Sequence, residues 1–114
     1  AASAILIEKG RQAASIIKQN LDKCELTARL ITTDYKKGLE ILLAEKKQFD
    51  LIFADPPYDL ITPDEFLRFP EKYPLLKPGA LIIMEHAGNI EPKIENILIT
   101  RRFGDSAITI VRHD

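Results

Sequence analysis

The feature that most constrains the fold of this 114-residue sequence is a regular alternation of short apolar runs with segments of helical periodicity. Short segments with consecutive apolar residues, at residues 5–7, 29–32, 49–54 and 80–84, predict strands. Apolar positions spaced for one face of a helix predict two helices, one at Ala13, Ile16, Ile17 and Leu21 and one at Tyr35, Leu39, Leu42 and Leu43. Strands that alternate with helices predict an α/β fold with a parallel, doubly wound sheet.

The second half of the sequence predicts a short helix and a closing hairpin. Residues 62–65, Thr-Pro-Asp-Glu, combine an N-cap, a proline at the first helical position and a glutamate at the capping-box position. Residues 75–79 predict a turn before the fourth strand. The segments 96–102 and 107–112, on either side of a Gly-Asp turn, predict an antiparallel β-hairpin.

Composition and charge are those of one ordinary globular domain. Apolar residues make up 46% and charged residues 29%, and the formal net charge is -1. This balance argues against a chain whose whole surface binds nucleic acid, although it allows a local basic face. Cys24 is the only cysteine, so no oxidising compartment is required, and no apolar run approaches the length of a membrane span. We therefore expect a cytoplasmic protein.

Polar clusters follow each of the predicted parallel strands. Glu8 ends the first strand, Asp34 closes the second, residues 55–58 follow the third, and Glu85 with His86 ends the fourth. The third strand is mostly apolar and its apolar residues do not alternate with polar ones, which is typical of a central strand covered on both faces. Because ligands of such sheets bind beyond the carboxyl ends of the strands, we expect these clusters to converge on one edge. The loops of the opposite edge carry no comparable cluster.

The segment Asp55-Pro56-Pro57-Tyr58 carries the most specific chemistry. Its two prolines supply carbonyl acceptors without competing N–H donors. A carboxylate and a carbonyl held side by side can accept both hydrogens of an exocyclic amino group, which localises the nitrogen lone pair for attack on an electrophilic methyl group. Tyr58 offers a flat face on which a base can stack, a contact worth about 1–3 kcal/mol. Asp-Pro pairs are also common in turns, but their position after an apolar strand favours a catalytic role.

A glycine-rich phosphate loop, which nucleotide-binding sheets usually carry after their first strand, has no counterpart here. The five glycines are scattered, and counting back about 20 residues from Glu8 leaves the chain. We therefore expect residues 1–114 to be a single partial domain, the back portion of a longer protein. No spacing of His, Cys and carboxylate residues indicates a bound metal.

The sequence resembles the class I S-adenosylmethionine-dependent methyltransferases with the DPPY motif, and among them the RsmD-type bacterial 16S rRNA (guanine-N2)-methyltransferases. The likeness rests on residues 5–8 with the helix that follows, and on residues 49–58, 76–86 and 101–107. It implies a Rossmann-like sheet, mostly parallel, with a C-terminal antiparallel hairpin. The family's first strand and glycine-rich loop are absent from this chain. In the family that strand lies between the strands that end at Glu8 and Asp55, so two unpaired strand edges are expected.

The resemblance also implies site residues and a substrate. Glu8 would bind the ribose hydroxyls of S-adenosylmethionine, Asp34 would contact the adenine with Tyr35 nearby, and Asp55 would touch both cofactor and base. The whole segment Asp55 to Tyr58 would hold the target guanine, whose exocyclic N2 is methylated. The implied partner is small-subunit rRNA or the assembling small ribosomal subunit, without a metal, a membrane or an obligate protein partner. We expect this activity of the intact protein rather than of the chain alone.

Other interpretations stay open on the sequence alone. The motif at Asp55 also occurs in adenine-N6 and cytosine-N4 DNA methyltransferases, although no room for their usual target-recognition region follows Tyr58. A cofactor-free RNA-binding module would account for the missing glycine loop. At the level of single residues, Glu8 could favour the positive end of the next helix, Asp34 could act as a helix cap, and His86 could be a structural histidine.

Overall fold

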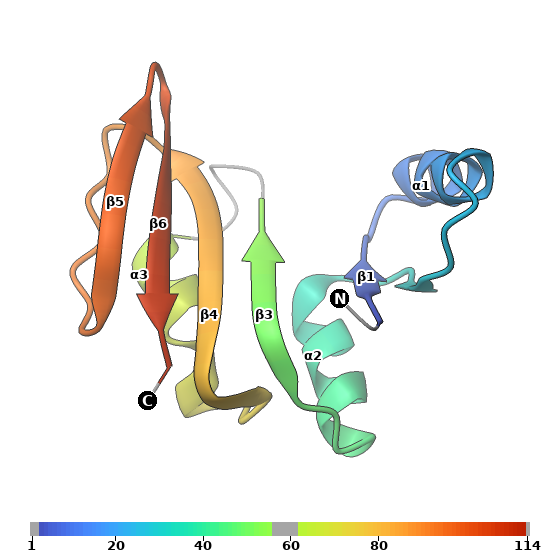
Figure 1. Ribbon diagram of the computed structural model, residues 1–114, viewed down its shortest axis with the longest axis horizontal. Helices are drawn as coiled ribbons and strands as arrows, with labels where there is room; N and C mark the ends of the chain where they lie inside the picture. Colours follow the sequence, from blue (N-terminus) through green and yellow to red (C-terminus); the bar gives the residue numbers. More distant parts are fainter. Residues whose placement is uncertain (1–2, 56–61, 114) are drawn as a thin grey trace. The chain divides into compact units, whose positions relative to one another are not determined.

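The computed structural model describes residues 3–55 and 62–113, and the chain divides into two compact units, Ala1–Glu45 and Lys46–Asp114. The first unit contains, in order, β1 (Ile5–Ile7), α1 (Arg11–Lys23), β2 (Arg29–Ile31) and α2 (Tyr35–Ala44). The second contains β3 (Phe49–Ala54), α3 (Pro63–Leu67), the short 3-10 helix η1 (Phe69–Glu71), β4 (Leu76–Ala87), β5 (Ile97–Phe103) and β6 (Ser106–Arg112). The predicted alternation of strands and helices is confirmed (Figure 1).

The first unit is a two-stranded parallel sheet with two helices. β1 and β2 pair from Ile5 with Arg29 to Ile7 with Ile31. Gly38 of α2 lies so close to β1 that a Cβ at this position would come within 2.6 Å of the Cδ1 atom of Ile7. Glycine is therefore required here by close approach rather than by backbone conformation.

The prediction for α1 is right about the helix but wrong about its buried face. Ala14 is the residue of α1 that is buried, whereas Ile16, which the periodicity placed on the apolar face, is 52% exposed. The three-residue strands of this unit are the reason, because they offer little apolar surface for a helix to cover.

The second unit is a four-stranded sheet in the order β3-β4-β6-β5, which Figure 1 shows side by side. β3 is parallel to β4, and the other two pairs are antiparallel. The predicted hairpin is confirmed, with Phe103 paired to Ser106 and a left-handed φ of 63° at Gly104 in its turn. Together with the parallel pair β1-β2, this gives the predicted α/β architecture with a closing antiparallel hairpin.

One face of this sheet forms the core of the second unit. Along β4 the side chains alternate, and those of Ala80, Ile82, Met84 and His86 are buried. α3 contacts β4, and with η1 it contributes buried Phe66, Leu67 and Phe69, the two phenyl rings lying 5.4 Å apart. α3 begins as predicted, since the Thr62 hydroxyl accepts a hydrogen bond from the Glu65 N–H with 3.1 Å between the two atoms. This capping fixes the helix start at Pro63.

Two strand predictions need correction. β4 starts at Leu76 rather than at residue 80, so most of the predicted turn lies inside the strand. Gly79 accommodates the irregularity with a φ of 82°, and the pairing register shifts between Phe49 and Leu51 on β3. A single glycine in the left-handed region can bend a strand without ending it.

β3 is not covered on both faces, as its apolar sequence had suggested. It is the outermost strand of its sheet, and Leu51 and Phe53 are 53% and 63% exposed. Among the described strands β3 pairs only with β4 and β1 only with β2, which agrees with the two unpaired edges expected from the resemblance. Within residues 3–55 and 62–113, no helix combines the length and the apolar character needed to cross a membrane.

Candidate active site

Asp55 and Glu85 lie in contact at the carboxyl edge of the second sheet. Ala54 of β3 pairs with Met84 of β4, and the next residue on each of these parallel strands is an acid. Asp55 hydrogen bonds to Glu85 and repels its negative charge, and both effects raise the pKa of Glu85 above its ordinary value. This edge therefore presents two carboxyl groups that can share a proton, and Asp55 itself is exposed.

Of the motif at residues 55–58, the structure places only its first member. Asp55 directly follows β3, where the sequence predicted it. Pro56, Pro57 and Tyr58 lie outside the described residues, so their roles stay predictions.

Glu8 follows β1 and bonds to the backbone that leads into α1. The Gly10 N–H donates to Oε1 of Glu8, with 3.1 Å between the atoms, and Gly10 is the N-cap of α1. A Cβ at position 10 would lie only 3.1 Å from the same oxygen. The contact supports a local structural role for Glu8. It occupies one of about four acceptor sites of the carboxylate, so it is compatible with ligand binding as well.

Asp34 caps α2. Its Oδ1 accepts a hydrogen bond from the Lys37 N–H, with 3.0 Å between the atoms, and Tyr35 is the first residue of the helix. Glu8 and Asp34 follow neighbouring parallel strands, and the Glu8 N–H donates to the Ile31 carbonyl with 3.1 Å between N and O. The two acids therefore belong to the same edge of the first sheet.

The predicted convergence of all four clusters on one edge stays a prediction. The structure brings Asp55 together with Glu85 in the second unit and puts Glu8 and Asp34 at one edge in the first. Each pair follows from the register of two neighbouring parallel strands.

His86 is a satisfied core residue, in agreement with its structural interpretation. Its side chain is 2% exposed, and Nδ1 lies 3.0 Å from the Ala87 carbonyl oxygen, so Nδ1 carries the proton and donates. Nε2 lies 2.7 Å from the Thr109 hydroxyl oxygen, which in turn lies 3.0 Å from the Thr100 hydroxyl oxygen. These bonds hold the ring on the buried face of β4, whereas the neighbouring residue Glu85 points to the other face.

The sequence predicts Glu85 among the polar residues of this edge, but it does not predict the contact of Glu85 with Asp55. The sequence put it at the end of a strand, but nothing in it showed that this strand would pair with β3 in the register that joins Ala54 to Met84. The available signal was the position of an acid one residue beyond the apolar run in each of two consecutive strands.

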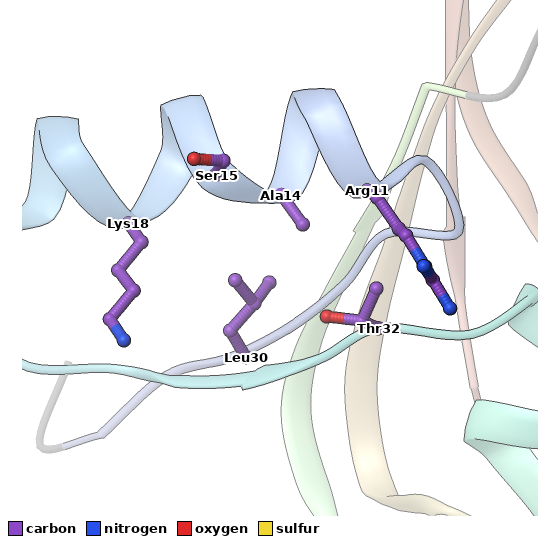
Figure 2. A pocket seen from close by; sticks show the side chains of 6 residues that line it. All are labelled: Arg11, Ala14, Ser15, Lys18, Leu30 and Thr32. Atoms are coloured by element: carbon purple, nitrogen blue, oxygen red, sulfur yellow. The ribbon is translucent and has the colours of Figure 1, made fainter.

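The first unit also contains a small cleft of about 280 Å³ between α1 and β2. In Figure 2, Ala14 of α1 points toward Leu30 of β2, and the side chains of Arg11 and Lys18 flank this pair. The two positively charged side chains beside this apolar pair could hold a small anion. The volume lies just below the usual range of ligand pockets, about 300–1,000 Å³.

A larger cavity, of about 810 Å³, lies at the opposite edge of the second sheet, where the sequence predicted no comparable feature. It is lined by residues of α3 and η1, by residues 93–96 and by the end of β6, near the bond from the His113 N–H to the Ala80 carbonyl. Its charged lining mixes Arg68, Lys93 and Arg112 with Glu71 and Glu95, a mixture that selects no single ligand charge. No group of three or more potential metal ligands occurs in the part of the chain that the structure describes.

Solved structures show which class of fold this is. A hypothetical protein from a Thermus species is 25% identical with a TM-score of 0.82, and the match covers 96% of this chain and 61% of that chain. A proposed methyltransferase from Escherichia coli is 24% identical with a TM-score of 0.77, and the match covers 100% of this chain and 64% of that one. The chain thus spans less than two thirds of the length of these relatives.

Two more distant neighbours have informative descriptions. One is a proposed methyltransferase complexed with S-adenosylhomocysteine (SAH), 13% identical with a TM-score of 0.71 over 97% of this chain and 39% of that chain. The other is an rRNA methyltransferase from Streptomyces viridochromogenes, 21% identical with a TM-score of 0.56 over 89% and 45% of the two chains. The fold is therefore part of a Rossmann-like methyltransferase fold. The chain belongs to the family described as conserved hypothetical protein 95, whose model matches residues 1–112. No curated protein matches it.

Proposed function

We propose that the intact protein transfers a methyl group from S-adenosylmethionine to the exocyclic N2 of a guanine in small-subunit (16S) rRNA. One observation carries the proposal: an exposed carboxylate, Asp55, ends β3 at the carboxyl edge of a Rossmann-like sheet and is followed in sequence by Pro-Pro-Tyr. The descriptions of several relatives as methyltransferases, one of them acting on rRNA, support the reaction and the substrate class.

In the proposed reaction Asp55 and the carbonyl of Pro56 each accept one hydrogen of the guanine amino group. Tyr58 stacks on the base and fixes its plane. The two acceptors localise the lone pair on N2, which bonds to the methyl carbon as the carbon–sulfur bond breaks and its electron pair stays on sulfur. The proton that N2 loses passes to Asp55. Glu85, in contact with Asp55, acts as a positioning residue.

Residues of the first unit would hold the cofactor, which supplies the electrophilic methyl group. Glu8 and Asp34 fit this role in chemistry, because both are acceptors at the carboxyl edge of a parallel pair and each uses one oxygen for a local backbone bond. The second oxygen of each can accept from a hydroxyl or an amino group. We assign the ribose hydroxyls to Glu8 and the adenine to Asp34 and Tyr35. The description of a relative with bound SAH supports this choice of cofactor.

The substrate is free small-subunit rRNA or the assembling small ribosomal subunit. A guanine that is stacked or paired in that RNA must turn out of its helix to reach Asp55, which favours unpaired or loosely structured targets.

The experiment combines labelled S-adenosylmethionine with unmodified small-subunit rRNA and identifies methylated nucleosides by mass spectrometry. Four proteins are assayed. They are this chain, the complete natural protein, and the complete protein with either Asp55→Ala or Asp50→Ala. Asp50 is a matched control, because it is an exposed carboxylate at the other end of β3. N2-methylguanosine from the complete protein and its Asp50 variant, but not from the Asp55 variant, is the expected result.

Other products would replace the proposal with one of its alternatives. Methylated adenine or cytosine in duplex DNA, with unlabelled rRNA, would assign the protein to the DNA methyltransferases. Tight RNA binding by the complete protein, without measurable binding of the cofactor, would favour a non-catalytic RNA-binding module.

A further inference from the structure

The turn of the β5–β6 hairpin lies at the same sheet edge as Asp55. β6 runs antiparallel to β4, so that Glu85 pairs with Ile108 and Ala87 with Ser106. The Gly88 N–H donates to the Asp105 carbonyl with 2.7 Å between N and O, which attaches the turn to the end of β4. Figure 1 shows this turn at the upper edge, toward which β3 and β4 also run.

Arg101, Arg102 and Phe103 are exposed beside this turn, and we call the two that share one face of the sheet, Arg101 and Phe103, the hairpin surface. Phe103 is 60% exposed, and both arginines are exposed. Within residues 3–55 and 62–113, neither guanidinium forms an ion pair or a side-chain hydrogen bond. Residues 97–112 contain three arginines against one aspartate, in a chain whose net charge is -1. The hairpin is therefore a local basic region on a near-neutral chain.

The pairing register of β4, β5 and β6 decides toward which face of the sheet each of these side chains points. Arg101 pairs with Ile108, which pairs with Glu85, so Arg101 lies on the same face of the sheet as the acid that contacts Asp55. Phe103, two residues further along β5, shares that face, and Arg102 points to the other one. β5 is three strands away from β3, a separation of about 14 Å at about 4.8 Å per strand. Roughly four stacked nucleotides cover this distance at about 3.4 Å each.

We propose that the hairpin surface binds single-stranded RNA that flanks the base held at Asp55. The choice of RNA over other polyanions rests on the proposed function. The Arg101 guanidinium fits phosphate oxygens, which it can bind through two parallel hydrogen bonds, whereas Arg102 points away from this face. The exposed ring of Phe103 fits a stacked base, a contact that tolerates any sequence. The surface thereby selects an unpaired segment next to the target and adds affinity that Asp55 and its neighbours alone do not supply.

The test measures binding of a short fluorescein-labelled single-stranded RNA to the complete protein by anisotropy, across a series of salt concentrations. Phe103→Ala is expected to weaken binding about 5- to 100-fold, and Phe103→Tyr to restore it, because a tyrosine ring still stacks. Arg101→Gln is expected to reduce the salt slope by about 0.7, for one lost phosphate contact, whereas Arg102→Gln on the other face should leave it unchanged. The melting temperature and the affinity for S-adenosylmethionine should stay unchanged, which separates loss of a contact from loss of folding.

Leu98→Ala and Arg112→Gln are matched controls, since both residues are exposed and lie at the far end of the same hairpin. RNA affinity of the Phe103 and Arg101 variants equal to that of these controls would overturn the proposal, even if rRNA is methylated. Loss of RNA affinity specific to the hairpin variants, without any methylated guanine, would support the RNA surface and overturn the proposed reaction. Failure of the unmutated protein to bind the RNA, or RNA-independent protein association through Phe103, would also overturn the inference.

Discussion

The two units follow the same alternation of strands and helices but differ in how much they bury. In the first unit the buried residues among those described are Ala14, Gly38, Leu39 and Leu42. The second unit has a continuous core in which Leu75 and Ala107 are 0% exposed and Ile82 and Met84 are 1% exposed. The comparison teaches that a sequence pattern can define elements in both units, whereas a core needs faces large enough to cover one another.

Strand length is the main physical source of the difference. β1 and β2 have three residues each, whereas β4 has twelve and its alternating side chains form one wall of the core. Large apolar side chains of the first unit stay in contact with water, with Ile16 52% and Leu26 62% exposed. The first unit thus contributes polar candidate residues, Glu8 and Asp34, without a comparable core.

The largest expected effect comes from separating the two units. We expect residues 46–114 alone to give a cooperative thermal transition, because that fragment contains the core of the second unit. Residues 1–45 alone should show no such transition, since isolated helices of this length are marginal in water. Circular dichroism during heating checks both. A cooperative transition in the fragment 1–45 would break the comparison.

Truncation of one apolar side chain in each unit should reproduce the difference in burial between the units on a smaller scale. Leu75→Ala should lower the free energy of unfolding by about 2–5 kcal/mol, because it removes a fully buried side chain. Leu26→Ala, at an exposed position of the first unit, should change it by no more than about 0.5 kcal/mol. Urea unfolding gives both values. Similar losses at the two positions would show that the first unit buries more than its exposure indicates.

A tight contact in the first unit offers a test that sharpens the comparison. Gly38→Ala should destabilise by about 1–3 kcal/mol, because the new methyl group would lie 2.6 Å from Cδ1 of Ile7. Ile7→Val removes that Cδ1 atom and should recover part of the loss in the double variant. The coupling energy from the double-mutant cycle is the measurement. Strict additivity would mean that α2 does not approach β1 as closely as the structure shows.

The smallest expected effect is a pH dependence at the Asp55–Glu85 contact. Because the pKa of Glu85 is raised in the folded protein, the folded state holds this proton more tightly than the unfolded chain does. The contribution of Glu85 to stability is therefore complete below the pKa of the unfolded chain, near 4.5, and is lost as the pH rises through the folded value. Glu85→Gln should remove this dependence, so the variant should gain stability relative to the unmutated protein as the pH rises from about 4 to about 7.

Urea unfolding at both ends of this pH range provides the readout. Glu91→Gln, which removes an exposed carboxylate from the loop between β4 and β5, is the control. The same pH-dependent change in both variants would contradict a specific contact between Asp55 and Glu85.

The order of the elements could be predicted because each has a local cause. The cap at Thr62, the apolar run before Asp55 and the turn at Gly104 all act within a few residues, and the structure has the element that each predicts. The candidate site was predictable in part for the same reason, since the end of an apolar run marks the end of a strand.

The register between strands that are distant in the sequence could not be predicted. Register decides that Asp55 meets Glu85, and no local pattern records which strands pair or in which register. The turn predicted at residues 75–79 failed because β4 begins at Leu76, which pairs with Phe49 of β3, and continues through Gly79. Likewise, the exposure of Ile16 reflects the small surface of a two-stranded sheet rather than any property of α1.

The most direct test of the central claim compares Asp55→Asn with Asp50→Asn in the complete protein. Single-turnover methyl transfer to unmodified small-subunit rRNA is the measurement, with cofactor affinity determined in parallel. If Asp55 holds the target amino group, the Asp55 variant should transfer methyl about 100- to 1,000-fold more slowly, with the Asp50 variant unchanged. Equal rates for both variants and the unmutated protein would contradict a catalytic role for the carboxylate at the end of β3.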